Sequence, residues 1–188
     1  MTGRVAGKAA LISGAATGIG QSIAVRLAAE GARVAVADID AEGGSDVVAE
    51  IEQAGGEAMF IALDVTDEDA VEALAQAACD EFDGLDIWVN NAGGSPISQP
   101  LTELSREEWD ATLKLNLTAV WACSVVAARH MEKGGRILNI SSKAAVDPVR
   151  GSGHYSAAKA GVNSLTATLA VELGPSIRVN GIMPGAVP

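Results

Sequence analysis

The sequence predicts an α/β protein built on a doubly wound parallel sheet. Short runs rich in β-branched and other apolar residues alternate along the chain with longer stretches of helical periodicity. The short runs are apolar on both faces, as expected of strands that are covered by helices on each side. A glycine-rich turn follows the first run and leads directly into the first helical stretch. These three observations indicate right-handed strand–helix–strand units with a ligand site near the strand ends.

Each element follows from this alternation. Strands are predicted at residues 9–13, 33–37, 58–63, 87–90, 136–141 and 177–183, and helices near residues 18–30, 41–54, 67–82, 105–131 and 155–173. Ser105 and Glu108 have the spacing of a capping box for the fourth helix, and Thr66 and Asp69 have it for the third. No internal repeat, low-complexity tract or linker divides the sequence, so we expect a single domain over residues 1–188.

Composition narrows the possible partners and compartment. Apolar residues make up 48% of the chain and aromatic residues only 3%, so aliphatic side chains must form the core. The formal net charge of −11 favours solubility and makes nucleic acid and membrane surfaces poor partner candidates. Cys79 and Cys123 lack the spacing of a metal site or a disulfide framework. We therefore expect reduced thiols, no metal and a cytoplasmic location.

The glycine-rich turn is a candidate phosphate-binding loop. It contains Gly14, Thr17, Gly18, Ile19 and Gly20, and a helix follows at once. Glycine allows the backbone to turn sharply and approach a pyrophosphate closely, and a helix N-terminus offers free N–H groups to that anion. A tight turn without a ligand is the alternative. The position between the first strand and the first helix favours a dinucleotide.

Asp38 ends the second strand and bears on the choice of cofactor. A carboxylate at this place can accept hydrogen bonds from both hydroxyls of an adenosine ribose and repels a 2′-phosphate. Ile39 and Asp40 follow it, and Thr17 stands where a basic residue could hold that phosphate. The pattern favours NAD over NADP. The alternative is that Asp38 only caps the next helix.

A polar constellation in the second half is a candidate reactive centre. Tyr155, the only tyrosine, shares a helix face with Lys159. A tyrosine hydroxyl normally ionises at about pH 10, and a nearby ammonium group favours its phenolate form. This spacing is common in helices, so its context matters. Ser142 lies just past the fifth strand, at the sheet edge where ligands bind. Asn116 is the single amide in an apolar helical stripe, and both a structural and a catalytic role stay open for it.

These motifs together resemble the classical short-chain dehydrogenase/reductase family over residues 5–188. The resemblance also rests on the run from Asn90 to Gly93, which we interpret as partly structural and partly a cofactor wall, and on Pro184-Gly185. Ser13 replaces the usual threonine and keeps the hydroxyl. The family implies a Rossmann-like sheet with strand order 3-2-1-4-5-6. Sugar-nucleotide epimerases and dehydratases share the scaffold, but they need a larger C-terminal domain and usually have tighter glycine spacing.

The resemblance implies an NAD-dependent oxidoreductase that interconverts a secondary alcohol and a ketone by hydride transfer. Tyr155 would exchange a proton with the substrate oxygen, which Ser142 would hold. Lys159 would bind the nicotinamide ribose, and Asn116 would hold a water molecule behind it. The implied cofactor contacts are Gly14, Thr17, Gly18, Ile19, Gly20, Asp38, Ile39, Asp64, Val65, Asn91, Ala92, Gly93, Tyr155, Lys159, Pro184, Gly185 and Val187.

The substrate pocket is the least defined part of this prediction. Loop position nominates Gly94, Ser95, Ala144, Val149 and His154. We interpret His154 as a pocket-rim or structural residue, because adjacent residues of a helix point apart. The substrate is a small alcohol or ketone that the sequence does not identify.

Two further expectations concern the end of the chain and its assembly. The family usually continues past the Pro-Gly motif with a substrate loop, a helix and a seventh strand, so we expect a C-terminally truncated chain that lacks this helix and strand. A cofactor-binding but inactive fragment is therefore the alternative function. Small residues on the last two helices predict a homodimer or homotetramer; they are Ala127, Ala128, Ala157, Ala158, Ala160 and Gly161.

Overall fold

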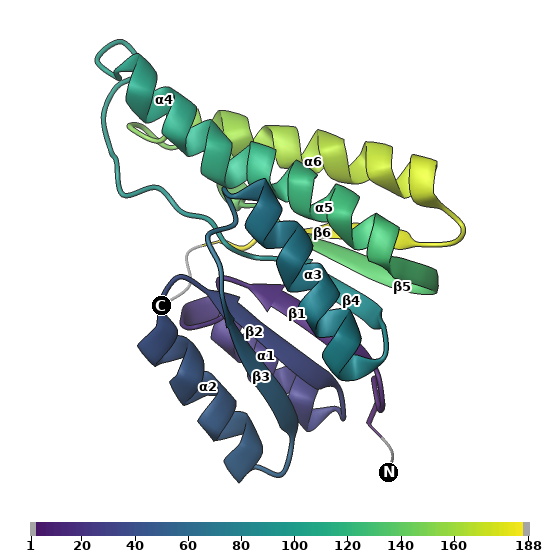
Figure 1. Cartoon of the computed structure of the whole chain (residues 1–188). Helices are drawn as coiled ribbons and strands as arrows, with labels where there is room; N and C mark the ends of the chain where they lie inside the picture. The colour runs from purple at the N-terminus through teal and green to yellow at the C-terminus, as the bar shows by residue number, and fades with distance from the viewer. Residues whose placement is uncertain (1–2, 186–188) are drawn as a thin grey trace.

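The computed structural model describes residues 3–185, apart from the side chains of residues 132 and 133. These residues form a parallel six-stranded sheet covered by helices on both faces (Figure 1). The strands are β1 (Ala9–Ser13), β2 (Arg33–Asp38), β3 (Glu57–Ala62), β4 (Leu85–Asn90), β5 (Met131–Ile140) and β6 (Arg178–Ile182). They pair in the order β3-β2-β1-β4-β5-β6, which confirms the predicted topology. The order reverses between β1 and β4, which places a crevice at the carboxyl ends of the strands.

The helices form two layers. They are α1 (Gly18–Ala29), α2 (Ala41–Gln53), α3 (Glu68–Phe82), α4 (Arg106–Leu113), α5 (Ala119–His130) and α6 (Gly153–Leu173), with a π turn η1 (Lys114–Thr118) and a 3₁₀ turn η2 (Lys143–Ala145). One core cluster joins α1 and α2 to one sheet face, and the other joins α3, α5 and α6 to the opposite face. The helix predicted over 105–131 is therefore divided by a π turn, and it ends at His130, where β5 takes over earlier than expected.

The helix starts test the capping predictions. The capping box of α4 is confirmed, because Ser105 Oγ accepts from the Glu108 N–H and the Glu108 carboxylate accepts from the Ser105 N–H. The box predicted from Thr66 and Asp69 for α3 is wrong. Asp67 caps that helix and accepts from the N–H groups of Asp69 and Ala70, while the Thr66 N–H donates to Asp64. A carboxylate one residue further along reaches the free N–H groups more directly than the threonine hydroxyl.

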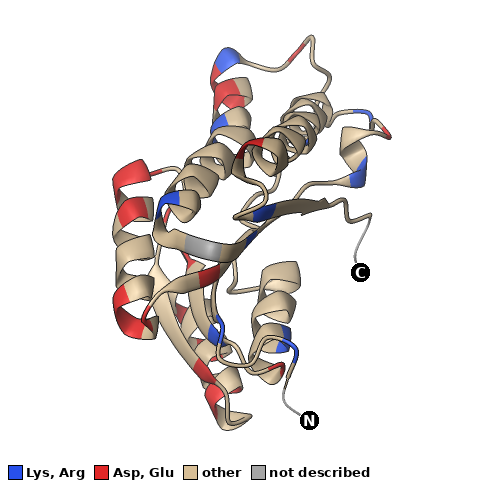
Figure 2. Ribbon diagram, turned by 90° about the vertical axis from the view of Figure 1, so that its right-hand side faces the viewer, with Lys and Arg blue, Asp and Glu red and all other residues tan. Residues whose placement is uncertain are grey.

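Burial shows how the apolar helices are used in this fold. The segment 106–130 is long and apolar enough to cross a membrane, but half of its most apolar stretch is buried in this fold, and α5 packs against α3, β4 and β5. Ala127 and Ala158 are fully buried, so these two small residues pack inside the domain; Ala157 and Ala160 are exposed. Asp and Glu residues (red in Figure 2) recur along several helices, in keeping with the net charge of −11.

Candidate active site

A cavity of about 920 Å³ lies at the carboxyl ends of the strands. Most of the predicted site residues line it: Gly14, Thr17, Gly18, Ile19, Asp38, Ile39, Asp64, Val65, Asn91, Ala92, Gly93, Gly94, Ser95, Ser142, Tyr155, Lys159, Pro184 and Gly185. Sequence reasoning missed Leu63, Thr66, Pro96, Leu115, Ile140 and Ser141, which also line it and mostly flank predicted residues at strand ends. The cavity is of a size that takes an organic cofactor.

Five predicted site residues do not line this cavity, and a sixth lies outside the residues that the structure describes. Gly20, Asn116, Ala144, Val149 and His154 are absent from its walls. Val149 is 58% exposed in the loop before α6, and the Ala144 N–H is directed to Ser142 within η2. Val187 lies outside the described residues. The assignment of Ala144 and Val149 to the substrate pocket, made from loop position alone, stays a prediction.

The glycine-rich turn has the backbone shape that the spacing predicted. Gly14 and Gly18 have φ values of +63° and +59°, in the left-handed region that favours glycine. A Cβ atom on Gly14 would stand 2.7 Å from Ala92 Cα, and one on Gly20 would collide with the Gly14 carbonyl. Gly20 thus allows α1 to pack onto the turn and does not face the cavity. The turn presents its backbone and the N-terminus of α1 to the cavity, a fit for a pyrophosphate.

Ser13 and Asn91 tie the end of β4 to this turn. The Asn91 amide donates to the carbonyls of Ser13 and Gly14, at 3.0 and 2.8 Å. Ser13 Oγ accepts from the N–H groups of Asn91 and Ala92, both at 3.2 Å, and donates to the Val89 carbonyl. The hydroxyl at position 13 therefore holds the cofactor wall in register with the turn.

Asp38 is held at the cavity by backbone N–H groups. One carboxylate oxygen accepts from Ala16 N at 2.9 Å and the other from Asp40 N at 3.1 Å. The cap of α2 is Asp40, which accepts from Gly43 N, so the interpretation of Asp38 as only a helix cap is wrong. Both oxygens of Asp38 retain lone pairs for further donors.

The π turn η1 brings Asn116 under the cavity wall. This side chain is fully buried; its oxygen accepts from Gly94 N at 2.9 Å, and its amide donates to the carbonyls of Gly94 and Thr112 at 2.9 and 3.0 Å. A Cβ atom on Gly93 would stand only 2.8 Å from the Asn116 oxygen. Asn116 therefore fixes the backbone that follows β4, which is the structural role that the sequence left open. A π turn of this kind often marks a functional site.

Tyr155 and Lys159 begin α6 and meet the end of β5. Lys159 is 2% exposed; its Nζ donates to the Ile140 carbonyl at 2.9 Å and lies 5.6 Å from the centre of the Tyr155 ring. Burial lowers the pKa of the Lys159 ammonium to about 8. Ser141 Oγ donates to the Lys159 carbonyl and so anchors α6 to β5. A positive charge is thus held close to the phenol ring in a water-poor setting.

Ser142 follows β5 with its hydroxyl on the cavity wall. Its oxygen accepts from the Ala144 N–H at 3.1 Å. No acceptor among residues 3–185 takes its hydrogen, which leaves the O–H able to donate to a ligand oxygen.

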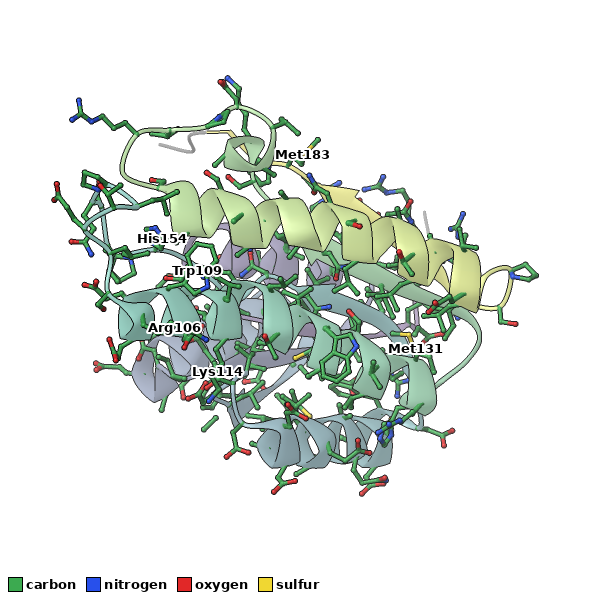
Figure 3. The ribbon with its side chains drawn as sticks, turned by 90° about the horizontal axis from the view of Figure 1, so that it is seen from above. Arg106, Trp109, Lys114, Met131, His154 and Met183 are labelled. Atoms are coloured by element: carbon green, nitrogen blue, oxygen red, sulfur yellow. The ribbon has the colours of Figure 1, made fainter. Side chains whose placement is uncertain are left out.

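His154 precedes Tyr155 but lies behind the wall. The ring is fully buried, and its Nε2 is 3.0 Å from Ser95 Oγ. In Figure 3, α6 lies beside the α4–α5 helix, and His154 stands where α6 begins, next to α4. A position on the pocket rim is therefore wrong for His154, and the structural alternative fits its burial.

A buried polar network that the sequence did not reveal supports the site from below. Asn90 donates to Ser124 and Asn139, at 2.9 and 2.8 Å, and Asn139 donates to Thr166 at 2.9 Å. The four side chains come from β4, α5, β5 and α6 in turn. They lock the two helices that carry or support the reactive residues onto the sheet.

Comparison with known proteins gives the family. The short chain dehydrogenase family matches over residues 8–188. The chain is 43% identical over 181 residues to cis-4-hydroxycyclohexanecarboxylate dehydrogenase of Sinomonas cyclohexanicum, covering 95% of this chain and 72% of that protein. It is 41% identical over 187 residues to D-threitol dehydrogenase of Mycolicibacterium smegmatis, covering 98% and 72%.

Solved structures agree with this result. A short chain dehydrogenase from Burkholderia cenocepacia in complex with NADP has a TM-score of 0.93 at 43% identity, covering 97% of this chain and 76% of that one. A dehydrogenase/reductase from Sinorhizobium meliloti also has a TM-score of 0.93 at 43% identity, covering 97% and 73%. With its sheet order, glycine turn and Ser142, Tyr155 and Lys159 on one cavity, the chain belongs to the short-chain dehydrogenase family.

Proposed function

We propose that the protein interconverts a secondary alcohol and a ketone with NAD, and that Tyr155 is its acid and base. The observation that carries the proposal is the convergence of Ser142, Tyr155 and Lys159 on one cavity with a glycine turn. The cofactor, when bound, supplies or accepts the hydride. The close backbone approach at Gly14 and the α1 N-terminus support a dinucleotide at this place.

The three side chains divide the proton chemistry among them. The Tyr155 hydroxyl gives its proton to the ketone oxygen in reduction, and the Tyr155 phenolate takes a proton from the alcohol in oxidation. Ser142 donates its free O–H to the same oxygen and holds it in place. The buried ammonium of Lys159 stabilises the negative charge that develops on the phenol oxygen. Asn116 acts through the backbone of Gly94 and so maintains the wall beside this group.

The preference for NAD rests on Asp38. Asp38 lines a cavity in which Lys159, near Tyr155, is the single cation among the lining residues that the structure describes. A 2′-phosphate beside Asp38 would meet a carboxylate and no compensating cation among those residues. We expect kcat/KM to be at least tenfold higher with NAD than with NADP. A higher kcat/KM with NADP than with NAD would refute this assignment.

The test of the mechanism is Tyr155→Phe. Removing the hydroxyl leaves the packing of the ring in place, so turnover is expected to fall by about 10³-fold or more while NADH binding, followed by fluorescence, survives. Near-normal turnover by the variant would refute the mechanism. Ser45→Ala, at an exposed position on α2, is the control and keeps both properties.

The alternative function is cofactor binding without turnover. The chain spans 72% of the length of both curated relatives named above. NADH binding by wild type together with no oxidation of any of a panel of sugars, polyols, steroids and hydroxy acids would favour it. We also propose that the protein is cytoplasmic and forms a homodimer or homotetramer. Exposed Ala157 and Ala160 on α6 support the assembly, and light scattering on the purified chain tests it.

A further inference from the structure

Two of the three serines that line the cavity, Ser142 and Ser95, use their hydroxyl groups in opposite ways. Ser142 Oγ accepts from Ala144 N and keeps its hydrogen free, as described above. Ser95 Oγ instead donates its hydrogen to the Ile97 carbonyl at 3.0 Å. Because a hydroxyl group has one hydrogen and two lone pairs, Ser95 cannot also donate to a ligand.

His154 completes the hydrogen bonding of Ser95. Its Nε2 is 3.0 Å from Ser95 Oγ, and since the serine hydrogen is already directed to Ile97, the imidazole must be the donor. The neutral ring then has its proton on Nε2, and its Nδ1, buried without a partner among residues 3–185, is an acceptor. Ser95, which lines the cavity, is left with one lone pair, so a ligand group that reaches this oxygen meets only an acceptor.

The segment that contains Ser95 is held against α4 and the start of α6. Gln99 N donates to the Gly151 carbonyl at 3.0 Å, and the Gln99 amide donates to Glu108 at 2.6 Å. A Cβ atom on Gly153 would stand 2.7 Å from the Leu101 side chain, so the two loops are in close contact. This wall is therefore positioned before any ligand binds. A Cβ atom on Gly93, two residues before Ser95, would stand 3.3 Å from Lys159 Nζ, which places this segment at the reactive end of the cavity.

The charges of the cavity lining point in the same direction. Within residues 3–185 the charged lining residues are Asp38, Asp64 and Lys159, and the lysine is bound to the Ile140 carbonyl. A substrate carboxylate near Ser95 would lose water and meet a lone pair, with no second cation among these residues to compensate. A substrate hydroxyl would instead find an acceptor for its hydrogen.

We propose that His154 fixes Ser95 as a hydrogen-bond acceptor, so that this wall selects neutral substrates with a second hydroxyl group over substrates with a carboxylate. The proposal rests on the alcohol oxidation proposed above, and it names the substrate class. His154 is a positioning residue, because it acts through Ser95 and does not line the cavity.

Two matched probes test the proposal: 4-(hydroxymethyl)cyclohexanol and 4-hydroxycyclohexanecarboxylate. Both contain the cyclohexane ring and the secondary hydroxyl group. They differ in the second substituent, which is a hydroxymethyl group in the first and a carboxylate in the second. Titration calorimetry on the NAD-loaded protein is expected to show at least tenfold tighter binding of the neutral probe. Because this readout is binding, it stands apart from the turnover assay in which the proposed function itself succeeds or fails.

Variants identify the residues responsible. Ser95→Ala removes the acceptor and is expected to reduce the preference at least fivefold, and His154→Leu, which lets Ser95 reorient, is expected to do the same. His154→Gln keeps an N–H donor and is expected to restore most of the preference, which a merely structural role would not produce. Ser45→Ala on α2 is the control and keeps the wild-type preference.

Three results would overturn the proposal. They are equal or tighter binding of the carboxylate by wild type, an unchanged preference in Ser95→Ala, and no measurable binding of either probe at millimolar concentration. If His154→Leu does not fold, as thermal unfolding shows, a loss of preference in Ser95→Ala together with its retention in His154→Gln supports the proposal. A loss of preference in a folded His154→Gln variant overturns the role of its N–H donor.

Discussion

Replacing Lys159 by methionine should stabilise the fold while removing function. The ammonium is 2% exposed, and its pKa is lowered from 10.5 to about 8 because burial disfavours the charged form. At about 1.4 kcal/mol per pKa unit, holding this charge costs on the order of 3 kcal/mol at neutral pH. Methionine has a stem of similar length but loses the bond to the Ile140 carbonyl, which offsets about 1 kcal/mol. We expect Lys159→Met to raise the free energy of unfolding by about 2 kcal/mol.

The pH dependence gives this prediction a sign that can be checked. Between pH 8 and the unfolded value of 10.5, the unfolded wild type binds more protons than the folded protein. The free energy of unfolding of the wild type therefore rises as pH rises through this window. Below pH 8 the destabilisation by the buried Lys159 charge is constant. The difference between Lys159→Met and wild type should be largest below pH 8 and shrink towards pH 10.5.

Urea unfolding of the cofactor-free proteins at several pH values measures this difference. Lys143→Met is the matched control, because its side chain is 64% exposed and pairs with Asp147 on the surface. Its effect should stay within about 0.5 kcal/mol at each pH. A variant that is less stable than wild type at pH 7, or a gap that does not change between pH 7 and 10, would refute the reasoning.

Three other predictions follow from single contacts. Asp38→Ala should lower kcat/KM for NAD and raise that for NADP, because the ribose acceptor and the charge that repels a 2′-phosphate go together; initial rates with both cofactors test this. Gly93→Ala should weaken NADH binding, followed by fluorescence, and turnover at least tenfold, since the new Cβ atom would press on Asn116. Gly94→Ala is the control: a Cβ atom there meets open space, so thermal unfolding and NADH fluorescence should stay unchanged. Ser105→Ala should cost about 1 kcal/mol of unfolding free energy in urea, because the capping box of α4 loses one of its two bonds; an unchanged midpoint would contradict it.

Local pattern was enough to predict the architecture and the cofactor loop. Strand and helix alternation depends on periodicity over a few residues, and the positive φ values at Gly14 and Gly18 follow from a glycine spacing that is visible in the chain. Tyr155 and Lys159 share a helix face for the same reason. These features depend on neighbours in sequence, so a single sequence contains the information for them.

Contacts between distant segments decided the rest. Asn116 meets Gly94 only because a π turn and the end of β4 come together. His154 stands next to Tyr155 in the chain, yet its ring is buried against Ser95, from a loop 59 residues away. Such contacts decide which polar atoms are hydrogen-bonded within the fold and which stay free to bind a ligand. Each N–H or O–H hydrogen is donated to one partner, and packing rather than sequence spacing determines that partner.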